Sequence, residues 1–362
     1  MNVVIAGGGT GGHLFPGIAV AQEWRRQDPQ TQILFLGSPH GIEVRVLPTY
    51  GFPLKTLAAK GFKGKNILQQ CAALAAVPVA FLQALRYVKD AHADIVVGLG
   101  GYSSFPAITA AYALGIPTAI HEQNSVPGLA NRLLGIIADA VFVSFEESRA
   151  YFPAAKTTVT GLPVREEFGR HATTCKDRFC LCVCGGSQGA RAINTAMAQA
   201  LPALRDRADR IYVLHQSGAA DCDMLKEQYA VHGIPAEVAP FVEHMAKWFS
   251  RADVVLCRAG ASTLAELALS GTASVLVPYP FAAGNHQERN AQVFAKRGAS
   301  ILLPQRELSG ERLGALLREL IDDPARCVVM GRQALTLARP HAAQDIVAAC
   351  RRMVKTGKNV AR

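Results

Sequence analysis

The sequence predicts an α/β fold in which helices cover both faces of parallel strands. Short, continuous runs of Val, Ile and Leu alternate with helix-length segments along the whole chain, which is typical of parallel strands buried on both sides. A glycine-rich turn also follows three of these runs and precedes a helix-like stretch, at residues 7–12, 98–101 and 185–189. Together the two patterns predict strand–helix–strand units of the Rossmann type.

The alternating pattern stops and restarts near residue 162, which predicts two Rossmann-like domains. We place them at residues 1–162 and 163–340, and we expect a C-terminal helix at about 341–362 to pack back on the first domain. Parallel strands present ligands at their carboxyl ends, so two such domains can face each other across a cleft. The expected strands are 2–6, 33–36, 95–98, 118–120, 140–143 and 159–160, then 179–184, 211–215, 236–239, 254–257, 274–277 and 300–303.

Composition favours a cytosolic protein with anionic partners. The 362 residues are 50% hydrophobic and carry a formal net charge of +10, which suits nucleotides, nucleic acid or an acidic membrane surface. Nine cysteines, an odd number, mostly lie in apolar runs and indicate reduced thiols. The basic residues are spread along the chain, and aromatic residues at 7% form no evident stacking platform, so we expect no nucleic acid.

Two groups of residues resemble metal sites, but each has a simpler interpretation. Cys180, Cys182 and Cys184 alternate along an expected strand, so their thiols share one buried face, and no His or Cys pair with zinc-type spacing accompanies them. Asp221 and Asp223 fall at the start of a helix-like stretch, where Asp is a common cap or first-turn residue. We therefore expect no metal and no cofactor.

The first glycine turn contains the spacing of a dinucleotide-binding fingerprint. That site also needs an acidic residue after the second strand to bind a ribose hydroxyl. Here the run 33–36 is followed by Gly37, Ser38 and Pro39. A nicotinamide or flavin enzyme is therefore disfavoured, and the three turns are better suited to phosphates or diphosphates bound at helix N-termini.

One segment has the features of a membrane-surface site. Residues 67–85 include Ile67, Leu68, Leu74, Val77, Val79, Phe81 and Leu82, but also polar residues and a proline, so they do not form a spanning helix. Lys60, Lys63 and Lys65 precede them and give a basic rim that an anionic bilayer would attract. The alternative is an ordinary core helix that follows a solvated lysine cluster.

Beyond these local features, an ordered set of motifs resembles the MurG family of bacterial glycosyltransferases, with similarity from residue 3 to about residue 300. The resemblance implies two Rossmann-like domains in the GT-B architecture. It also implies inverting transfer of N-acetylglucosamine from UDP-GlcNAc to undecaprenyl-diphospho-muramoyl-pentapeptide (lipid I), by a peripheral enzyme on the cytoplasmic face of the plasma membrane. The alternative is another GT-B glycosyltransferase with a different acceptor. The motifs are Gly8-Gly9-Thr10-Gly11-Gly12-His13, Gly100-Gly101-Tyr102, His121-Glu122-Gln123-Asn124, Pro163-Val164-Arg165, Gly185-Gly186-Ser187-Gln188-Gly189-Ala190-Arg191, His215-Gln216-Ser217-Gly218 and Gly260-Ala261-Ser262-Thr263-Leu264-Ala265-Glu266.

The same resemblance implies a set of contacts to the donor nucleotide sugar. The amides that open the helix after Gly260 would bind the diphosphate, and Glu266 would accept the ribose hydroxyls. Glu266 has an alternative role, because Thr263 and Glu266 have the spacing of a capping box. The implied donor residues are Thr10, Gly11, Gly12, Asn124, Arg165, Ser187, Val242, Ala261, Ser262, Thr263, Leu264, Ala265, Glu266 and Gln287.

On the acceptor side, the resemblance implies that His13 is the general base and Glu122 the reserve candidate. The positive end of a helix disfavours imidazolium, which keeps His13 neutral and able to take a proton. The alternative is that His13 only orients the acceptor diphosphate or caps its helix. Residues of the first two glycine turns would hold that diphosphate, namely Gly9, Gly100, Gly101 and Tyr102.

Overall fold

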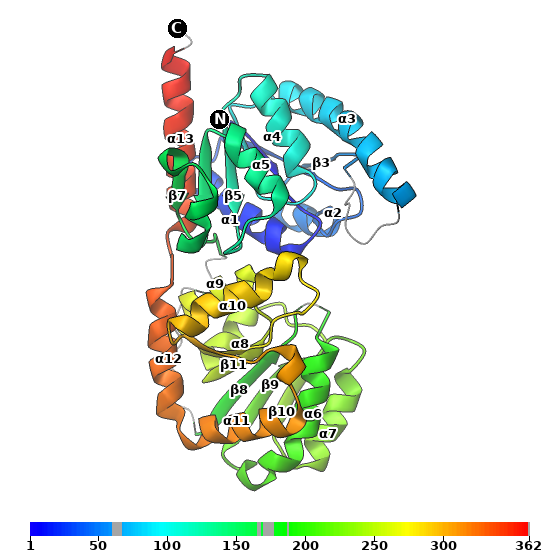
Figure 1. Cartoon of the computed structure of the whole chain (residues 1–362), viewed down its shortest axis with the longest axis vertical. Helices are drawn as coiled ribbons and strands as arrows, with labels where there is room; N and C mark the ends of the chain where they lie inside the picture. Colours follow the sequence, from blue (N-terminus) through cyan, green and yellow to red (C-terminus); the bar gives the residue numbers. More distant parts are fainter. Residues whose placement is uncertain (60–66, 165–167, 169–176, 187, 361–362) are drawn as a thin grey trace. The chain divides into compact units, whose positions relative to one another are not determined.

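The computed structural model describes residues 1–59, 67–164, 168, 177–186 and 188–360, of which 67–75 and 357–360 are described as backbone only. The chain divides into two compact units (Figure 1). Unit 1 consists of Met1–Arg165 together with Pro340–Arg362, and unit 2 consists of Glu166–Arg339. The basic rim of Lys60, Lys63 and Lys65 lies outside the described residues, as do Arg165, Ser187 and the side chains of Ile67, Leu68 and Leu74.

Unit 1 contains a parallel sheet in the order β3-β2-β1-β4-β5-β6-β7. The order turns back on itself at β1, so the carboxyl ends of β1 and β4 form the switch point at which such sheets bind ligands. The sequence predicts β1, β2, β4, β5 and β6, but it places the last strand at 159–160, which shares only Val159 with β7. It misses β3, a short edge strand that pairs with β2. The strands are β1 (Asn2–Ala6), β2 (Gln32–Gly37), β3 (Leu54–Thr56), β4 (Ile95–Gly98), β5 (Thr118–Glu122), β6 (Ala140–Val143) and β7 (Thr157–Val159).

Helices cover both faces of this sheet because alternate strand residues point to opposite sides. Val3 and Ile5 face a layer that contains α1 and α13, whereas Val4 and Ala6 face the layer that contains α3, α4 and α5. The helices are α1 (Gly11–Gln27), α2 (Glu43–Val46), α3 (Ile67–Asp90), α4 (Ser104–Ala113), α5 (Leu129–Ile137) and α13 (Ala342–Val360), with short 3-10 turns η1 (Leu47–Tyr50), η2 (Glu146–Tyr151) and η3 (Ala154–Lys156).

The last helix of the chain, α13, completes the core of unit 1. Its buried residues Ile346, Val347 and Cys350 belong to the same cluster as residues of α1. Arg351 donates a hydrogen bond to Gln27 Oε1 at 3.0 Å, and its guanidinium lies 3.6 Å from the carboxylate of Asp28. The final segment thus returns to the unit that the first residues begin.

Unit 2 repeats the architecture with the sheet order β10-β9-β8-β11-β12-β13, all parallel. Its strands are β8 (Phe179–Cys184), β9 (Ile211–Gln216), β10 (Ala236–Ala239), β11 (Val254–Cys257), β12 (Ala273–Leu276) and β13 (Ser300–Leu302). Its helices are α6 (Arg191–Leu204), α7 (Cys222–Val231), α8 (Met245–Arg251), α9 (Ala261–Ser270), α10 (His286–Lys296), α11 (Gly310–Asp322) and α12 (Pro324–Thr336), with 3-10 turns η5 (Arg205–Arg207), η6 (Ala283–Asn285) and η7 (Gln305–Glu307).

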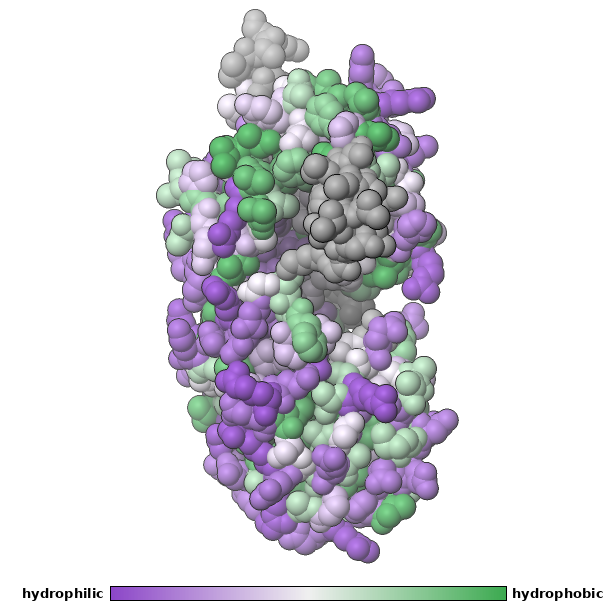
Figure 2. Space-filling view, turned by 45° about the vertical axis from the view of Figure 1, so that its right-hand side comes forward, coloured by the Kyte–Doolittle hydropathy of each residue, from purple (hydrophilic) through white to green (hydrophobic). Residues whose placement is uncertain are grey.

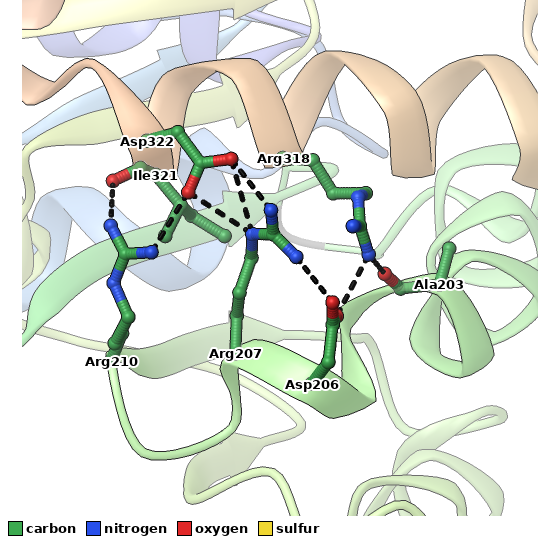
Figure 3. A network of polar contacts seen from close by, with 7 residues as sticks. All are labelled: Ala203, Asp206, Arg207, Arg210, Arg318, Ile321 and Asp322. Atoms are coloured by element: carbon green, nitrogen blue, oxygen red, sulfur yellow. Dashed lines mark hydrogen bonds and ion pairs between the residues drawn. The ribbon is translucent and has the colours of Figure 1, made fainter.

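A surface network of arginines and aspartates ties η5 to α11 in unit 2 (Figure 3). Arg207 lies between Asp206 and Asp322, and Arg210 donates to Asp322 at 2.8 Å. Arg318 on α11 reaches back to Asp206 at 2.7 Å. Hydrogen bonds from Arg207 and Arg210 lower the pKa of Asp322 to about 2, so the network is intact at neutral pH.

The two groups that resemble metal sites have the local structure expected from the sequence. Cys180, Cys182 and Cys184 are all buried on β8. Asp221 is the N-cap residue of α7 and accepts a hydrogen bond from the Asn194 amide at 2.7 Å. In the described part of the chain, no group of three or more His, Cys, Asp or Glu side chains is arranged to hold a metal ion. Nor does any described helix combine the length and apolar character needed to cross a bilayer.

Candidate active site

The first glycine turn of unit 1 is held from beneath by a buried acidic side chain. Glu43 on α2 is fully buried. It accepts a hydrogen bond from the Gly9 N–H at 2.8 Å and another from the Ser38 N–H at 2.7 Å. A Cβ at Gly8 or at Gly41 would overlap the carboxyl group. Glycine is therefore needed here to make room for Glu43, and one amide of the turn is already bonded.

His13, on the first turn of α1, lies against the second glycine turn. Its Nδ1 is 3.2 Å from Oε1 of Gln123, a buried residue that directly follows β5. Gly100 has a φ of +84°, and a Cβ there would lie 2.9 Å from the His13 ring. The close packing of the His13 ring is therefore a second reason why glycine is needed at position 100, in addition to its positive φ.

The second glycine turn leads into the N-terminus of α4. Ser103 is the N-cap residue, yet its side chain makes no capping bond. Its hydroxyl oxygen is buried with no hydrogen-bond partner among the described residues. A Cβ at Gly101 would lie 2.8 Å from the Gly8 carbonyl oxygen, so the two turns are in close contact. The structure thus brings Gly9, His13, Gly100, Gly101 and the half-exposed Tyr102 to the switch point of the sheet.

Glu122, the reserve base, is enclosed by its own loop. Its carboxyl group accepts hydrogen bonds from the Asn124 amide N–H at 2.9 Å, the Asn124 side chain at 3.1 Å and the Asn131 side chain at 2.8 Å. The Gly128 N–H adds a fourth at 3.3 Å. Burial raises the pKa of Glu122. This geometry favours a role in shaping residues 123–128 over proton abstraction.

In unit 2 the glycine turn after β8 is held by a neutral amide. Gln216, at the end of β9, donates to the Gly186 carbonyl oxygen at 2.8 Å and accepts from the Val242 N–H at 3.1 Å. A Cβ at Gly189, where φ is +73°, would overlap the Ser217 carbonyl. The turn therefore packs directly on the backbone that follows β9.

A buried polar network supports this region from inside the domain. Asn194 donates to the Ser217 carbonyl oxygen and to the Asp221 carboxylate, both at 2.7 Å. Because the amide nitrogen of Asn194 makes both of these hydrogen bonds, its Oδ1 is free to accept one from His215 Nε2 at 3.1 Å. His215 Nδ1 then accepts a hydrogen bond from the Tyr229 hydroxyl at 2.9 Å. Burial lowers the pKa of His215 to about 3, which keeps the ring neutral.

The helix α9, which contains most of the implied donor residues, begins after Gly260. Thr263 is its third residue rather than its N-cap, so the capping-box interpretation of Thr263 and Glu266 is wrong. The Ser262 hydroxyl is buried with no partner among the described residues. Leu264 is fully buried, so only its backbone is available to a ligand. On α10, Gln287 accepts from the Tyr279 N–H at 2.9 Å.

The structure brings part of the implied donor set together in unit 2. The turn after β8 and the N-terminus of α9 follow two strands that pair with each other, β8 and β11, and Val242 is tied to the turn through Gln216. Thr10, Gly11, Gly12 and Asn124 belong to unit 1. Sequence reasoning missed the roles of Glu43, Gln123 and Gln216. Gln123 and Gln216 lie inside the family motifs, whereas Glu43 lies in none of them.

Comparison with known proteins agrees with this arrangement. The glycosyltransferase family 28 N-terminal domain matches residues 3–143, and the glycosyltransferase family 28 C-terminal domain matches residues 180–346. A crystal structure of Acinetobacter baumannii MurG superimposes with a TM-score of 0.80 at 32% identity and covers 97% of this chain and 100% of its own. The chain belongs to the MurG family.

Two curated members of the MurG family illustrate how close the relationship is. A Syntrophus aciditrophicus protein is 42% identical over 358 residues, which is 98% of this chain and 99% of the relative. A Geobacter sulfurreducens protein is 44% identical over 353 residues, 96% of this chain and 97% of the relative. Both are named UDP-N-acetylglucosamine--N-acetylmuramyl-(pentapeptide) pyrophosphoryl-undecaprenol N-acetylglucosamine transferase. The family and the α/β fold with two Rossmann-like domains, both predicted from the sequence, are confirmed.

Proposed function

We propose that this chain moves N-acetylglucosamine from UDP-GlcNAc to undecaprenyl-diphospho-muramoyl-pentapeptide, converting lipid I into lipid II with inversion at the anomeric carbon. The observation that carries the proposal is similarity over nearly the full length to transferases whose names state this reaction. The helix N-termini at the sheet edges of both units support it, since each is an anion site by its geometry.

The donor binds to unit 2 in this proposal. The first amides of α9, at Ala261, Ser262 and Thr263, take the diphosphate, and the unpartnered Ser262 hydroxyl adds a donor. Because these donors supply positive potential, the step needs neither a metal ion nor a cofactor. Glu266, one turn further along α9, accepts the ribose hydroxyls. The Val242 N–H is bonded to Gln216, so Val242 faces uracil with its carbonyl.

The remaining donor residues enter the proposal from the motifs shared with the family rather than from contacts in the structure. Arg165 and Ser187 lie outside the described residues, and we retain them as diphosphate ligands because they lie in motifs shared with the family. Gln287, whose side chain accepts a hydrogen bond from the Tyr279 N–H, is retained as a further donor contact. Leu264 and Ala265 contribute backbone only.

The acceptor binds to unit 1. Its diphosphate lies at the N-terminus of α4, where the amides that follow Gly100 and Gly101 and the unpartnered Ser103 hydroxyl can donate. The Gly9 amide already donates to Glu43, so the first glycine turn contributes fewer donors than the second. His13 accepts the proton of the acceptor hydroxyl as its oxygen bonds to the anomeric carbon and the bond to the UDP oxygen breaks.

We also propose that unit 1 docks peripherally on the cytoplasmic face of the plasma membrane. The outer faces of α3, α4 and α5, which pack side by side on the sheet, expose apolar side chains, and Figure 2 shows hydrophobic areas on this unit. Such a surface suits an acceptor embedded in lipid by its polyprenyl tail. The exposed residues are Val79, Leu82, Tyr112, Leu114, Leu129, Leu133 and Ile136.

The transfer reaction is tested with radiolabelled UDP-GlcNAc and a short-chain lipid I analogue. We expect label to move to the analogue in the presence of the chain, and the His13→Ala variant to lower kcat by about 10²–10⁴-fold with UDP affinity unchanged. Transfer to other acceptors in place of the lipid I analogue would favour a different GT-B glycosyltransferase. A rise in acceptor KM with unchanged kcat would make His13 an acceptor ligand.

Membrane docking is tested with vesicles of anionic and of neutral lipid. Changing Leu82, Leu133 and Ile136 together to Ser should release the chain from anionic vesicles and leave activity on the short-chain acceptor intact. The matched control changes Val328 and Val329 to Ser. These two residues on α12 of unit 2 are about equally exposed. Equal vesicle binding by the triple variant and the control would contradict docking through these helices.

A further inference from the structure

The contact between His13 and Gln123 has a consequence for the proton transfer. We propose that Gln123 is a positioning residue that holds His13 in the neutral tautomer with hydrogen on Nδ1, so that Nε2 faces the acceptor as the basic atom. The inference rests on the proposed function, in which His13 is the base. It stands on three observations in unit 1: the orientation of one amide, the state of a second histidine, and the packing of Gly100.

The Gln123 amide can be oriented in one way only. Its Nε2 lies 2.7 Å from the Leu99 carbonyl oxygen and 3.2 Å from the His121 carbonyl oxygen. Turning the amide over would bring Oε1 against two carbonyl oxygens, with no hydrogen between these acceptor atoms. Oε1 therefore points at His13, and because an amide oxygen only accepts, the His13 Nδ1 at 3.2 Å must donate.

His121 supports this orientation from the other side of the amide. Its Nε2 lies 2.9 Å from the Gly161 carbonyl oxygen and so carries the hydrogen, which leaves Nδ1 as an acceptor 3.3 Å from Gln123 Nε2. Burial lowers the pKa of His121 to about 4. The ring thus stays neutral at physiological pH, and its Nδ1 is a third acceptor that faces the NH₂ group of Gln123.

The surroundings also fix the ring of His13. A Cβ at position 100 would lie 2.9 Å from Cε1 and Nδ1 of the ring, so Gly100 packs tightly against this edge. Gln123 is itself almost fully buried. A neutral amide directs the proton as a carboxylate would, but it stabilises imidazolium less strongly. Gln123 therefore sets the tautomer of His13 without favouring the charged ring as a carboxylate would.

The decisive measurement needs no substrate. In chain labelled with ¹⁵N-histidine, with the His13 signals assigned by comparison with His13→Asn, we expect the chemical shifts of the Nδ1–H tautomer in the neutral ring. Gln123→Met, which has similar volume and no acceptor, should remove that preference and lower kcat about 10- to 100-fold with donor KM within twofold. Gln123→Glu should raise the acid limb of the kcat/KM profile by about one pH unit, since a nearby carboxylate favours imidazolium.

Some results would overturn the inference. Wild-type His13 with hydrogen on Nε2 would contradict it directly, even if the Gln123 variants fail to fold. A Gln123→Met variant with unchanged tautomer and unchanged pH limb would also contradict it. If the tautomer shifts as expected but wild-type chain transfers no sugar to the lipid I analogue, the proposed function is wrong while the assignment of the His13 tautomer stands.

Discussion

The two glycine turns that open the two sheets are held in different ways. In unit 1 an acidic side chain from the segment after β2, Glu43, accepts the Gly9 N–H. In unit 2 a neutral amide at the end of β9, Gln216, donates to the Gly186 carbonyl instead. Glu43 thus engages a backbone donor of one turn, whereas Gln216 engages a backbone acceptor of the other.

This difference shows that a glycine in the sequence can indicate a close contact, but not whether the contacting group is a side chain, backbone or a ligand. Around the first turn, Gly8, Gly37 and Gly41 leave space for the carboxyl group of Glu43. Around the turn in unit 2, Gly189 and Gly218 leave space for backbone. Neither set is explained by a ligand, although both turns have the sequence pattern of a phosphate site.

The largest expected effect comes from removing the acidic support of unit 1. Glu43→Ala leaves two backbone N–H groups without their partner and empties a buried volume, which should cost about 3 kcal/mol of unfolding free energy. Each unit contains one tryptophan, Trp24 in unit 1 and Trp248 in unit 2. Fluorescence in a Trp248→Phe background therefore reports urea unfolding of unit 1 by itself.

The Glu43→Gln variant is the matched control. It keeps the volume and one acceptor oxygen, so its loss should be smaller than that of Glu43→Ala. A loss of equal size in both variants would mean that Glu43 acts by its charge rather than by its two hydrogen bonds. No change in unit 1 for either variant would remove the basis of the comparison.

Removing the buried polar network around Asn194 should lower the unfolding free energy of unit 2 by a somewhat smaller amount. Asn194→Ala removes the partner of the Ser217 carbonyl, of Asp221 and of His215, and should cost about 2 kcal/mol. A Trp24→Phe background isolates the fluorescence of Trp248. If unit 1 were destabilised instead, the network would not be local to unit 2.

Acid should weaken both units through their buried histidines, and unit 2 over a wider range. The folded pKa is about 4 for His121 and about 3 for His215, below the unfolded value of 6.5. The unfolded chain therefore binds more protons, so stability present above pH 6.5 is lost as pH falls, by at most about 1.4 kcal/mol per pH unit for each group. Urea titrations at pH 7 and 5 with His215→Gln should show a flatter pH dependence in unit 2.

The smallest effect should come from the surface network of η5 and α11. Arg207→Met removes its ion pairs with Asp206 and Asp322, but exposed pairs contribute little and are screened by salt. We expect a small downward shift of the urea midpoint of unit 2 that disappears at high salt concentration. A shift that persists there would indicate that Arg207 acts by packing.

The sequence predicts the sheets well because a continuous apolar run is a local signal. The missed strand, β3, is only Leu54–Thr56, includes Lys55, and lies at an edge where pairing with β2 decides its conformation. The capping-box interpretation failed for a similar reason, because the residues that fix the start of α9 lie before Thr263.

The sequence predicted those residues of the candidate site that lie in the family motifs. Residues such as His13, Gly100 and Gly101 lie in motifs, and the structure does bring them together. Glu43 could not be recognised, because a single glutamate more than thirty positions from Gly9 has no local pattern that distinguishes it from a surface residue. Its role depends on a contact that only the tertiary structure creates.

The return of α13 to unit 1 sets the order in which the chain can fold during synthesis. Residues 166–339 leave the ribosome as a complete unit while unit 1 still lacks its last helix. Until Ile346, Val347 and Cys350 emerge, the apolar face of the first core that they cover stays open to water. Unit 2, though second in the sequence, is thus the first that can finish folding, and a ribosome that stops before residue 342 releases a chain whose earliest segment is the unfinished one.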